Sequence, residues 1–266
     1  MTNPPSALTL AVDRELVRLG AAPPSQHRLE RQLRHLAKWR CELLANTLAA
    51  SGAAVRAGPF AGMHYGVGQS EGSRTARLLG LYEASLHPVI EAVIARAYAQ
   101  VLDIGCAEGY YAVGLARRMP GTRVHARDTS PDARGRCARL AAANGVAERM
   151  VIGGAVTHAD LTLCAAAETF LLCDIEGAEE QLLAPDLAPA LREADLLVEV
   201  HEGTRPGLVD RLTGRFAATH RVTRIERRFR ADLLPPWAAT LSDLDCLLLL
   251  WEWRATPTPW LWMERR

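Results

Sequence analysis

Four polar residues in this chain each close a short apolar run, which is the pattern of a site at the edge of a parallel sheet. Asp103, Asp128 and Asp174 close three of these runs, and His201 closes a fourth. The carboxyl ends of parallel strands meet at one edge of an open sheet, where ligands bind. We therefore expect the three carboxylates and the imidazole to share a site that binds a cationic ligand and removes a proton from a substrate.

The first of these acids opens a glycine-rich turn. Asp103, Gly105 and Gly109 have the spacing acid-x-Gly-x-x-x-Gly, and 112–118 is predicted to be a helix. Such a turn lets a ligand approach the backbone, and the helix N-terminus offers unpaired N–H groups. The middle glycine of the dinucleotide fingerprint is missing. An acid before the first glycine suits a ligand with a cationic centre, and S-adenosylmethionine (SAM) is such a ligand.

The stretch from Val101 to Tyr111 resembles the first motif of class I SAM-dependent methyltransferases. The resemblance implies a Rossmann-like fold and a cofactor site. Asp128 lies at the distance where that fold places a carboxylate on the ribose hydroxyls, although it could instead be a turn or N-cap acid. For Glu108, contact with the cofactor and capping of the helix both stay open. The residues predicted to bind SAM are Asp103, Gly105, Cys106, Ala107, Glu108, Gly109, Tyr110, Asp128, Thr129 and Asp174.

The run Asp174-Ile-Glu-Gly-Ala-Glu resembles the corresponding segment of FkbM-type methyltransferases, many of which methylate oxygen. A strand that ends in Glu-x-His, here at His201, also occurs in that family. The resemblance covers about residues 97 to 205. Its specificity comes from the order of the motifs and not from any one of them. The resemblance implies a mostly parallel, seven-stranded sheet.

Methyl transfer to an alcohol or phenol requires loss of the hydroxyl proton, and histidine is the usual general base near neutral pH. We predict catalytic roles for His201, with Asp174 and Glu176 beside it. His201 could instead be a structural histidine, and His64 and His220 are weaker candidates for the base. A second alternative is a site for Mg²⁺ or a similar ion at Asp174, Glu176 and His201. The acids could also hold the substrate or cap the next helix.

The predicted reaction is O-methylation of a small natural product or a sugar hydroxyl. Two alternatives stay open, namely N-methylation of a small molecule and a non-catalytic SAM-binding module. A net charge of +1 and a pI of about 7.7 give no field that would attract nucleic acid or an anionic membrane. The Asn-Pro-Pro-Tyr type of motif found in amino-methylating nucleic-acid enzymes is also absent after the fourth strand, where Asp-Ile-Glu-Gly stands, so a nucleic-acid substrate is disfavoured.

The chain of 266 residues is predicted to have a helical N-terminal extension and lid over 1–97 and a catalytic domain over 98–266. Apolar spacing predicts helices over 6–20 and 26–50, a loop over 52–76, and a helix over 79–98 that Pro88 breaks or kinks. The basic face of the second helix is open to three interpretations: solvation, contact with RNA, or packing against a second subunit in a homodimer.

Strands and helices alternate after residue 100, which predicts a sheet with helices on both faces. We expect strands over 100–104, 122–127, 149–153, 169–174, 195–201, 219–226 and 244–253, the last of them antiparallel and containing Leu247 to Trp251, with an insertion over 232–242. The tryptophans that follow residue 236 are expected to pack on the N-terminal helices, to line the acceptor pocket or to form a dimer interface.

Six cysteines without C-x-x-C spacing favour reduced, buried thiols and a cytoplasmic protein. We expect no transmembrane helix because no run of eighteen apolar residues occurs, and no signal peptide because the N-terminus lacks the basic and apolar pattern. The abundance of arginine and alanine suggests GC-rich coding and a bacterial biosynthetic source.

Overall fold

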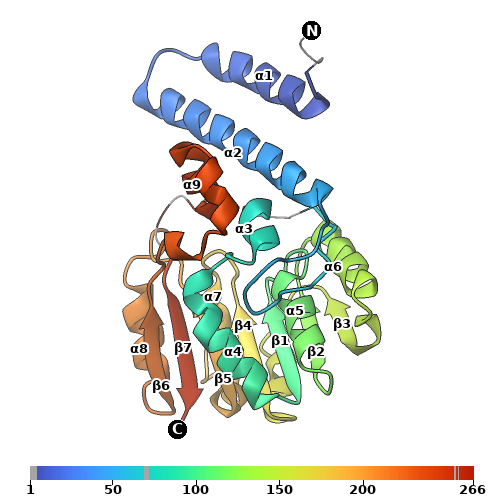
Figure 1. Cartoon of the computed structure of the whole chain (residues 1–266). Coiled ribbons are helices and arrows are strands. Elements are labelled where there is room, and N and C mark those ends of the chain that lie inside the picture. The colour runs from blue at the N-terminus through green and yellow to red at the C-terminus, as the bar shows by residue number, and fades with distance from the viewer. Residues whose placement is uncertain (1–4, 69–71, 255, 257) are drawn as a thin grey trace.

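The computed structural model describes residues 5–68, 72–254, 256 and 258–266. Seven strands form one sheet in the order β3-β2-β1-β4-β5-β7-β6, and β7 runs antiparallel to both of its neighbours (Figure 1). The remaining neighbouring strands pair in parallel, so the predicted fold class is confirmed. The strands are β1 (Gln100–Ile104), β2 (Arg123–Arg127), β3 (Met150–Gly153), β4 (Thr169–Cys173), β5 (Ala194–Glu199), β6 (His220–Ile225) and β7 (Trp260–Arg265).

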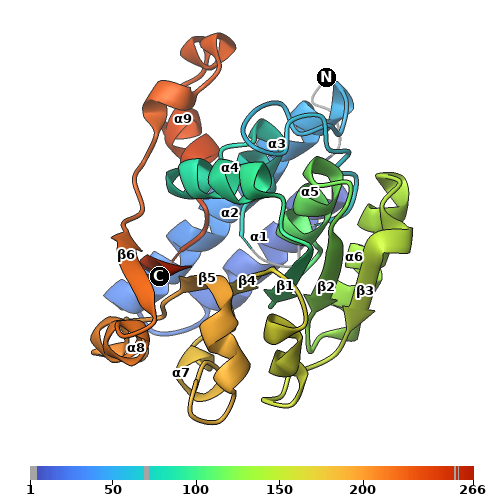
Figure 2. The same ribbon diagram turned by 90° about the horizontal axis from the view of Figure 1, so that it is seen from below.

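Helices cover both faces of the sheet, and alternate strand residues enter the two apolar layers (Figure 2). Val101 of β1 packs toward the face under α4 and α5, whereas Leu102 packs toward the face under α8. Strands buried on both faces are mostly apolar, which makes β1, β4 and β5 recognisable in the sequence. The helices of these layers are α4 (His87–Arg96), α5 (Tyr110–Arg118), α6 (Pro131–Ala143), α7 (Glu179–Leu182) and α8 (Leu208–Phe216).

The predicted N-terminal helices are α1 (Ala7–Gly20) and α2 (Gln26–Ala50), which lie beyond the carboxyl edge of the sheet (Figure 1). Ser6 and Ser25 begin them, because each side chain accepts a hydrogen bond from a backbone N–H of the first turn. Helix α2 packs on α3 (Arg74–Leu79) and α9 (Asp243–Leu250). Arg40 fixes α2 to α9 through a two-bond contact with Asp245, at 2.6 and 2.7 Å.

The expected last strand over 244–253 is wrong, because Asp243–Leu250 forms helix α9 and the antiparallel strand is β7. A short apolar run does not by its periodicity separate a strand from a helix. The capping signal decides the outcome here: Ser242 accepts a hydrogen bond from the N–H of Asp245, and acids occupy the first turn. Trp251 and Trp253 therefore do not share a sheet face.

The expected helix over 79–98 is also wrong in its first half: α3 begins earlier, inside the predicted loop, and ends at Leu79, and a 3₁₀ turn at Ala84–Leu86 precedes α4. Pro88 lies in the first turn of α4, where its missing N–H costs no hydrogen bond. In the described part of the chain, the stretch Arg74–Arg96 is one candidate membrane span by length and a mean hydropathy of 1.3, and half of its most apolar window is buried inside the protein.

Candidate active site

A cavity of about 580 Å³ opens at the carboxyl edge of β1, β2 and β4. Nine of the ten residues predicted to bind SAM line it, and Gly109 is the exception among them. The cavity is also lined by Glu176, by His158 from the loop after β3, and by Arg77, Tyr82 and Glu83 from the segment before α4. The volume lies within the usual range for small-molecule sites, about 300–1,000 Å³.

The glycine turn after β1 has a geometry that only glycine satisfies. Gly105 has φ +85°, and a Cβ there would lie 1.7 Å from the backbone oxygen of Asp174. Its N–H and that of Cys106 both donate to the carbonyl of Arg127, at 2.8 and 3.0 Å. Gly105 therefore allows the turns after β1 and β4 to touch, in addition to giving a ligand access to the backbone.

Asp103 presents a buried carboxylate to the cavity. Its side chain is 1% exposed, and no other side chain pairs with either oxygen among the described residues. Burial and the neighbouring Asp174 raise the pKa of Asp103 to about 8, against an opposing effect of the Ala112 N–H. A buried acid without an internal partner is costly unless a donor or a cation is supplied from outside.

Asp128 both lines the cavity and holds the glycine turn. One carboxylate oxygen accepts from the N–H of Ala107 at 2.9 Å, and the other accepts from the N–H of Ser130 at 2.8 Å. The two interpretations left open for Asp128 are therefore compatible, since a turn acid can also face a ligand.

Glu108 connects the glycine turn to the N-terminal segment. The Tyr65 hydroxyl donates to its carboxylate at 2.6 Å, and Arg77 pairs with the same oxygen at 3.2 Å. The Glu108 and Arg77 side chains are 0% and 4% exposed. Arg77 was not predicted to be a site residue. The one feature of the sequence that could have indicated it is a charged residue directly before the apolar pair Leu78-Leu79.

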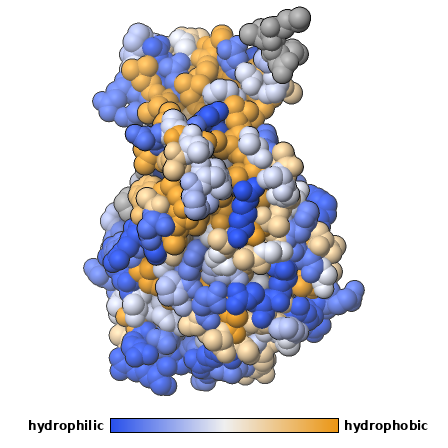
Figure 3. Space-filling view, viewed as in Figure 1, coloured by the Kyte–Doolittle hydropathy of each residue, from blue (hydrophilic) through white to orange (hydrophobic). Residues whose placement is uncertain are grey.

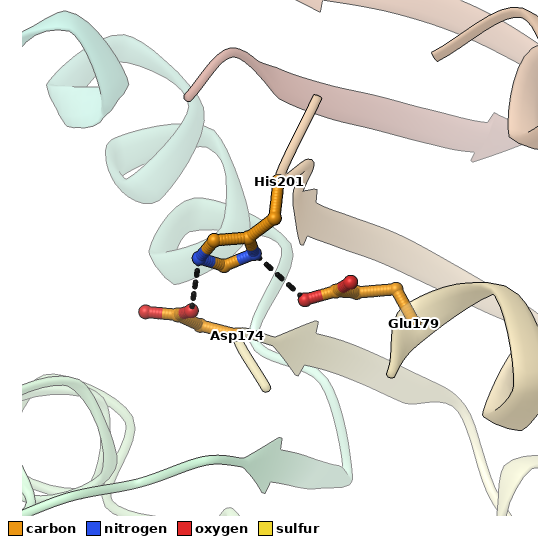
Figure 4. A group of neighbouring side chains, drawn as sticks. All are labelled: Asp174, Glu179 and His201. Carbon is orange, nitrogen blue, oxygen red and sulfur yellow. Dashed lines mark hydrogen bonds and ion pairs between the residues drawn. The ribbon is translucent and has the colours of Figure 1, made fainter. Parts of the chain in front are cut away.

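His201 lies between two carboxylates (Figure 4). Its Nδ1 is 2.9 Å from Glu179 Oε1, and its Nε2 is 3.7 Å from Asp174 Oδ1. Glu176, on the exposed turn after β4, comes within 3.3 Å of Nε2. The predicted cluster of Asp174, Glu176 and His201 therefore converges, although His201 itself lies behind Asp174 and does not line the cavity among the described residues.

The electrostatics of this group favour a shared proton. Burial would lower the pKa of His201, but the bond to Glu179 and the charges of Asp174 and Glu176 more than offset it, so the pKa is raised. Burial and the charge of Glu83 raise the pKa of Asp174 to about 7. Glu179 is the last residue of the Asp174-Ile-Glu-Gly-Ala-Glu run, but the spacing of that run does not indicate that Glu179 contacts His201.

A second buried ionic cluster borders the site. Arg254 contacts Glu83 and Glu199 and donates to Glu252 at 3.0 Å. The three acids are each at most 7% exposed. Burial and then Glu83 raise the pKa of Glu252 to about 7. Apart from Glu199 in the Glu-x-His pattern, none of these residues could be given a role from the sequence, because they come from distant parts of the chain.

The weaker base candidates lie elsewhere. His220 is fully buried, with Nε2 2.9 Å from the carbonyl of Ala194 at the amino edge of the sheet. Burial lowers the pKa of His220, and its place at the opposite edge of the sheet from the cavity favours a structural role. His64 is exposed and lines a separate depression beside α6.

The metal-ligating side chains around His201 lie on both sides of its ring. Among the described residues, ligand atoms of Asp174, Glu179 and His201 lie within 4.8 Å of one another, which adds Glu179 to the predicted set of Asp174, Glu176 and His201. The imidazole ring stands between the two carboxylates, each facing its own nitrogen (Figure 4). An ion at Nε2 would therefore take its carboxylate ligands from Asp174 and its neighbours, while Glu179 held the opposite nitrogen.

No family model and no curated protein matches this chain. Several solved structures are similar to it. The O-methyltransferase TomG from Streptomyces achromogenes, in complex with SAM, is 15% identical and aligns over 65% of this chain and 77% of its own, with a TM-score of 0.44. An O-methyltransferase from Bacillus cereus, in complex with SAH, is 11% identical over 96% and 97% of the two chains, with a TM-score of 0.46.

A human methyltransferase 10 domain containing protein is 11% identical over 85% of this chain and 96% of its own, with a TM-score of 0.47. At these identities and TM-scores the likenesses carry no argument about activity. The functional conclusion therefore rests on the residues of the cavity.

Proposed function

We propose that this chain is a SAM-dependent methyltransferase that methylates a hydroxyl of a small natural product or sugar. The observation that carries the proposal is Asp103, a buried carboxylate that faces the cavity beside the glycine turn and has no side-chain partner among the described residues. The ammonium and sulfonium groups of SAM would supply the positive charge that such an acid requires. The glycine turn and the N-terminus of α5 would accept the rest of the molecule.

The acceptor would occupy the part of the cavity near Asp174. Bound SAM supplies an electrophilic methyl group, so the protein's own residues must orient the acceptor oxygen in line with it and take up the hydroxyl proton. Asp174 lines the cavity, and His201 Nε2 faces Asp174 at 3.7 Å. We assign proton uptake to this pair, with His201 as the base that finally holds the proton.

Transfer of a labelled methyl group tests this proposal. The purified chain is incubated with methyl-labelled SAM and a panel of phenols, sugars and amines, beside the Asp174→Asn variant. We expect label in a hydroxyl product from the parent and a large loss of rate in the variant. Binding of SAM without transfer to any acceptor would favour the non-catalytic module.

Methylation of an amine is the second candidate function, and the charge of the cavity favours it. Glu83, Asp174 and Glu176 all line the cavity and would attract an ammonium group. Such an acceptor must lose a proton before it reacts, so the Asp174–His201 pair would serve it too. Labelled product from amines alone would replace the hydroxyl assignment.

Metal assistance is a variant of the same proposal. Asp174 and Glu176 offer the oxygen ligands that Mg²⁺ prefers, and His201 Nε2 lies 3.7 and 3.3 Å from them. Chelator should then abolish transfer and added Mg²⁺ should restore it. Full activity in the presence of chelator would leave proton uptake to the Asp174–His201 pair alone.

A further inference from the structure

Glu179 is a fully buried carboxylate beside the site, and its contacts converge on one oxygen. The side chain is 0% exposed. Its Oε1 faces His201 Nδ1 at 2.9 Å and accepts from the N–H groups of Gly177 at 3.1 Å and Ile175 at 3.2 Å. Burial would raise the pKa of Glu179, but the bonds to His201 and to these N–H groups lower it.

The turn held by Glu179 has an uncommon backbone conformation. Glu176 has φ +56°, a region that residues other than glycine seldom adopt, and Gly177 follows with φ +101°. Strained turns of this kind persist when surrounding contacts over-determine them, and they gather at functional sites. Two of the N–H groups in this turn bond to Glu179, and Glu176 itself faces both the cavity and His201.

We propose that Glu179 is a positioning residue that fixes the tautomer and orientation of His201, an inference that rests on the proposed function. A carboxylate on Nδ1 keeps the proton on that nitrogen, so Nε2 is left unprotonated and directed at Asp174. The same carboxylate sets the turn that carries Glu176. One buried charge thus orients both groups that stand beside the acceptor end of the cavity.

Four carboxylates from neighbouring elements face His201. Asp174 follows β4, Glu176 lies in the next turn, Glu179 begins α7, and Glu199 of β5 places Oε2 3.9 Å from Nε2. Glu199 also pairs with Arg254, which offsets part of its charge. Glu179 differs from the other three because it alone meets Nδ1, and because its exposed fraction is zero.

The test replaces Glu179 by glutamine, with Glu180→Gln as the matched control. Glu180 is the next residue of the same helix, but it points outward to Arg211. Nitrogen spectra of ¹⁵N-histidine-labelled protein with bound S-adenosylhomocysteine report the tautomer and titration of each imidazole, and His201→Gln identifies the His201 signals. This readout requires no turnover.

At a pH above the His201 pKa, we expect the parent and Glu180→Gln to show His201 protonated on Nδ1 with Nε2 free. In Glu179→Gln both tautomers should appear, and the His201 pKa should fall because a negative charge that stabilised the imidazolium is gone. An unchanged tautomer and titration in Glu179→Gln would overturn the inference. If Glu179→Gln does not fold, Glu179→Asp keeps the charge but shortens the reach to Nδ1, and mixed tautomers are again expected.

Kinetics give a second, independent readout. The base must be unprotonated, so the acidic limb of the rate profile should move to lower pH in Glu179→Gln, and kcat should fall by about 10–100-fold with KM for SAM unchanged. A merely structural role would lower the thermal midpoint and leave the pH profile in place, which would contradict the proposal. If the parent protein shows no turnover, the proposed function is contradicted. The nitrogen spectra would still test the effect of Glu179 on the His201 tautomer.

Discussion

At the scale of single residues, the candidate site contains buried carboxyl groups that a positively charged ligand would stabilise. Asp103 and Asp174 have pKa values raised to about 8 and about 7, primarily by burial. The types and positions of these acids could be predicted from the sequence, since each closes an apolar strand. Their protonation could not, because it depends on burial and on carboxylates that arrive from other strands.

His201 provides the residue-scale prediction. His201→Ala should lower the maximal rate of methyl transfer by about 10²–10⁴-fold, because the base is lost, while SAM affinity stays nearly intact. Steady-state rates and calorimetry on the same samples measure both quantities. His64→Ala, which removes an exposed imidazole away from the cavity, should leave both unchanged. An unaffected rate in His201→Ala would transfer proton uptake to another group.

At the scale of elements, ionic contacts fasten segments that the sequence keeps far apart. Arg254 joins Glu83, which precedes α4, to Glu199 of β5 and to Glu252 after α9. Strands and capped helices could be predicted from local patterns, and most of them were. Pairings over such distances leave no local signal, and the leucines of α9 were assigned to a strand because their packing partners on α2 were unknown.

Arg254 therefore yields the prediction at this scale. Arg254→Met should destabilise the protein by about 3–5 kcal/mol, because it leaves buried carboxylates without their cation. Arg230→Met is the control, since that arginine pairs with Asp232 in solvent and such pairs contribute about 0–1 kcal/mol. Urea unfolding at neutral pH measures both. Equal stability of the two variants would show that the cluster contributes nothing net.

At the scale of the whole molecule, the N-terminal extension stands over the edge of the sheet that bears the cavity (Figure 1). Within the described residues its inner segment, through Arg77, Tyr82 and Glu83, lines the cavity, whereas α1 and α2 do not. Large apolar side chains are exposed on α1, α2 and α9, over the upper part of the surface in Figure 3. Such a surface is what a second subunit would cover, and the homodimer stays a prediction.

The predicted role of the N-terminal segment as a lid leads to a test on the whole chain. Bound SAM should slow hydrogen exchange over 58–83, because ligand contacts with Tyr82 and Glu83 would stabilise a segment already tied to the glycine turn through Glu108. Residues 69–71 of that range lie outside the described part of the chain. Exchange in α1 should not change and serves as the internal reference. Equal exchange with and without SAM would limit the extension to folding or assembly.

The most direct test of the central claim is calorimetry of SAM with the parent and Asp103→Asn. The substitution keeps the shape of the side chain and removes the charge that would meet the cofactor. We predict that the parent binds SAM, that Asp103→Asn binds it at least about 10-fold more weakly, and that Asp132→Asn, a change at an exposed acid of α6, leaves affinity unchanged. Equal affinity in Asp103→Asn and the parent, or tighter binding of NAD than of SAM, would contradict the account.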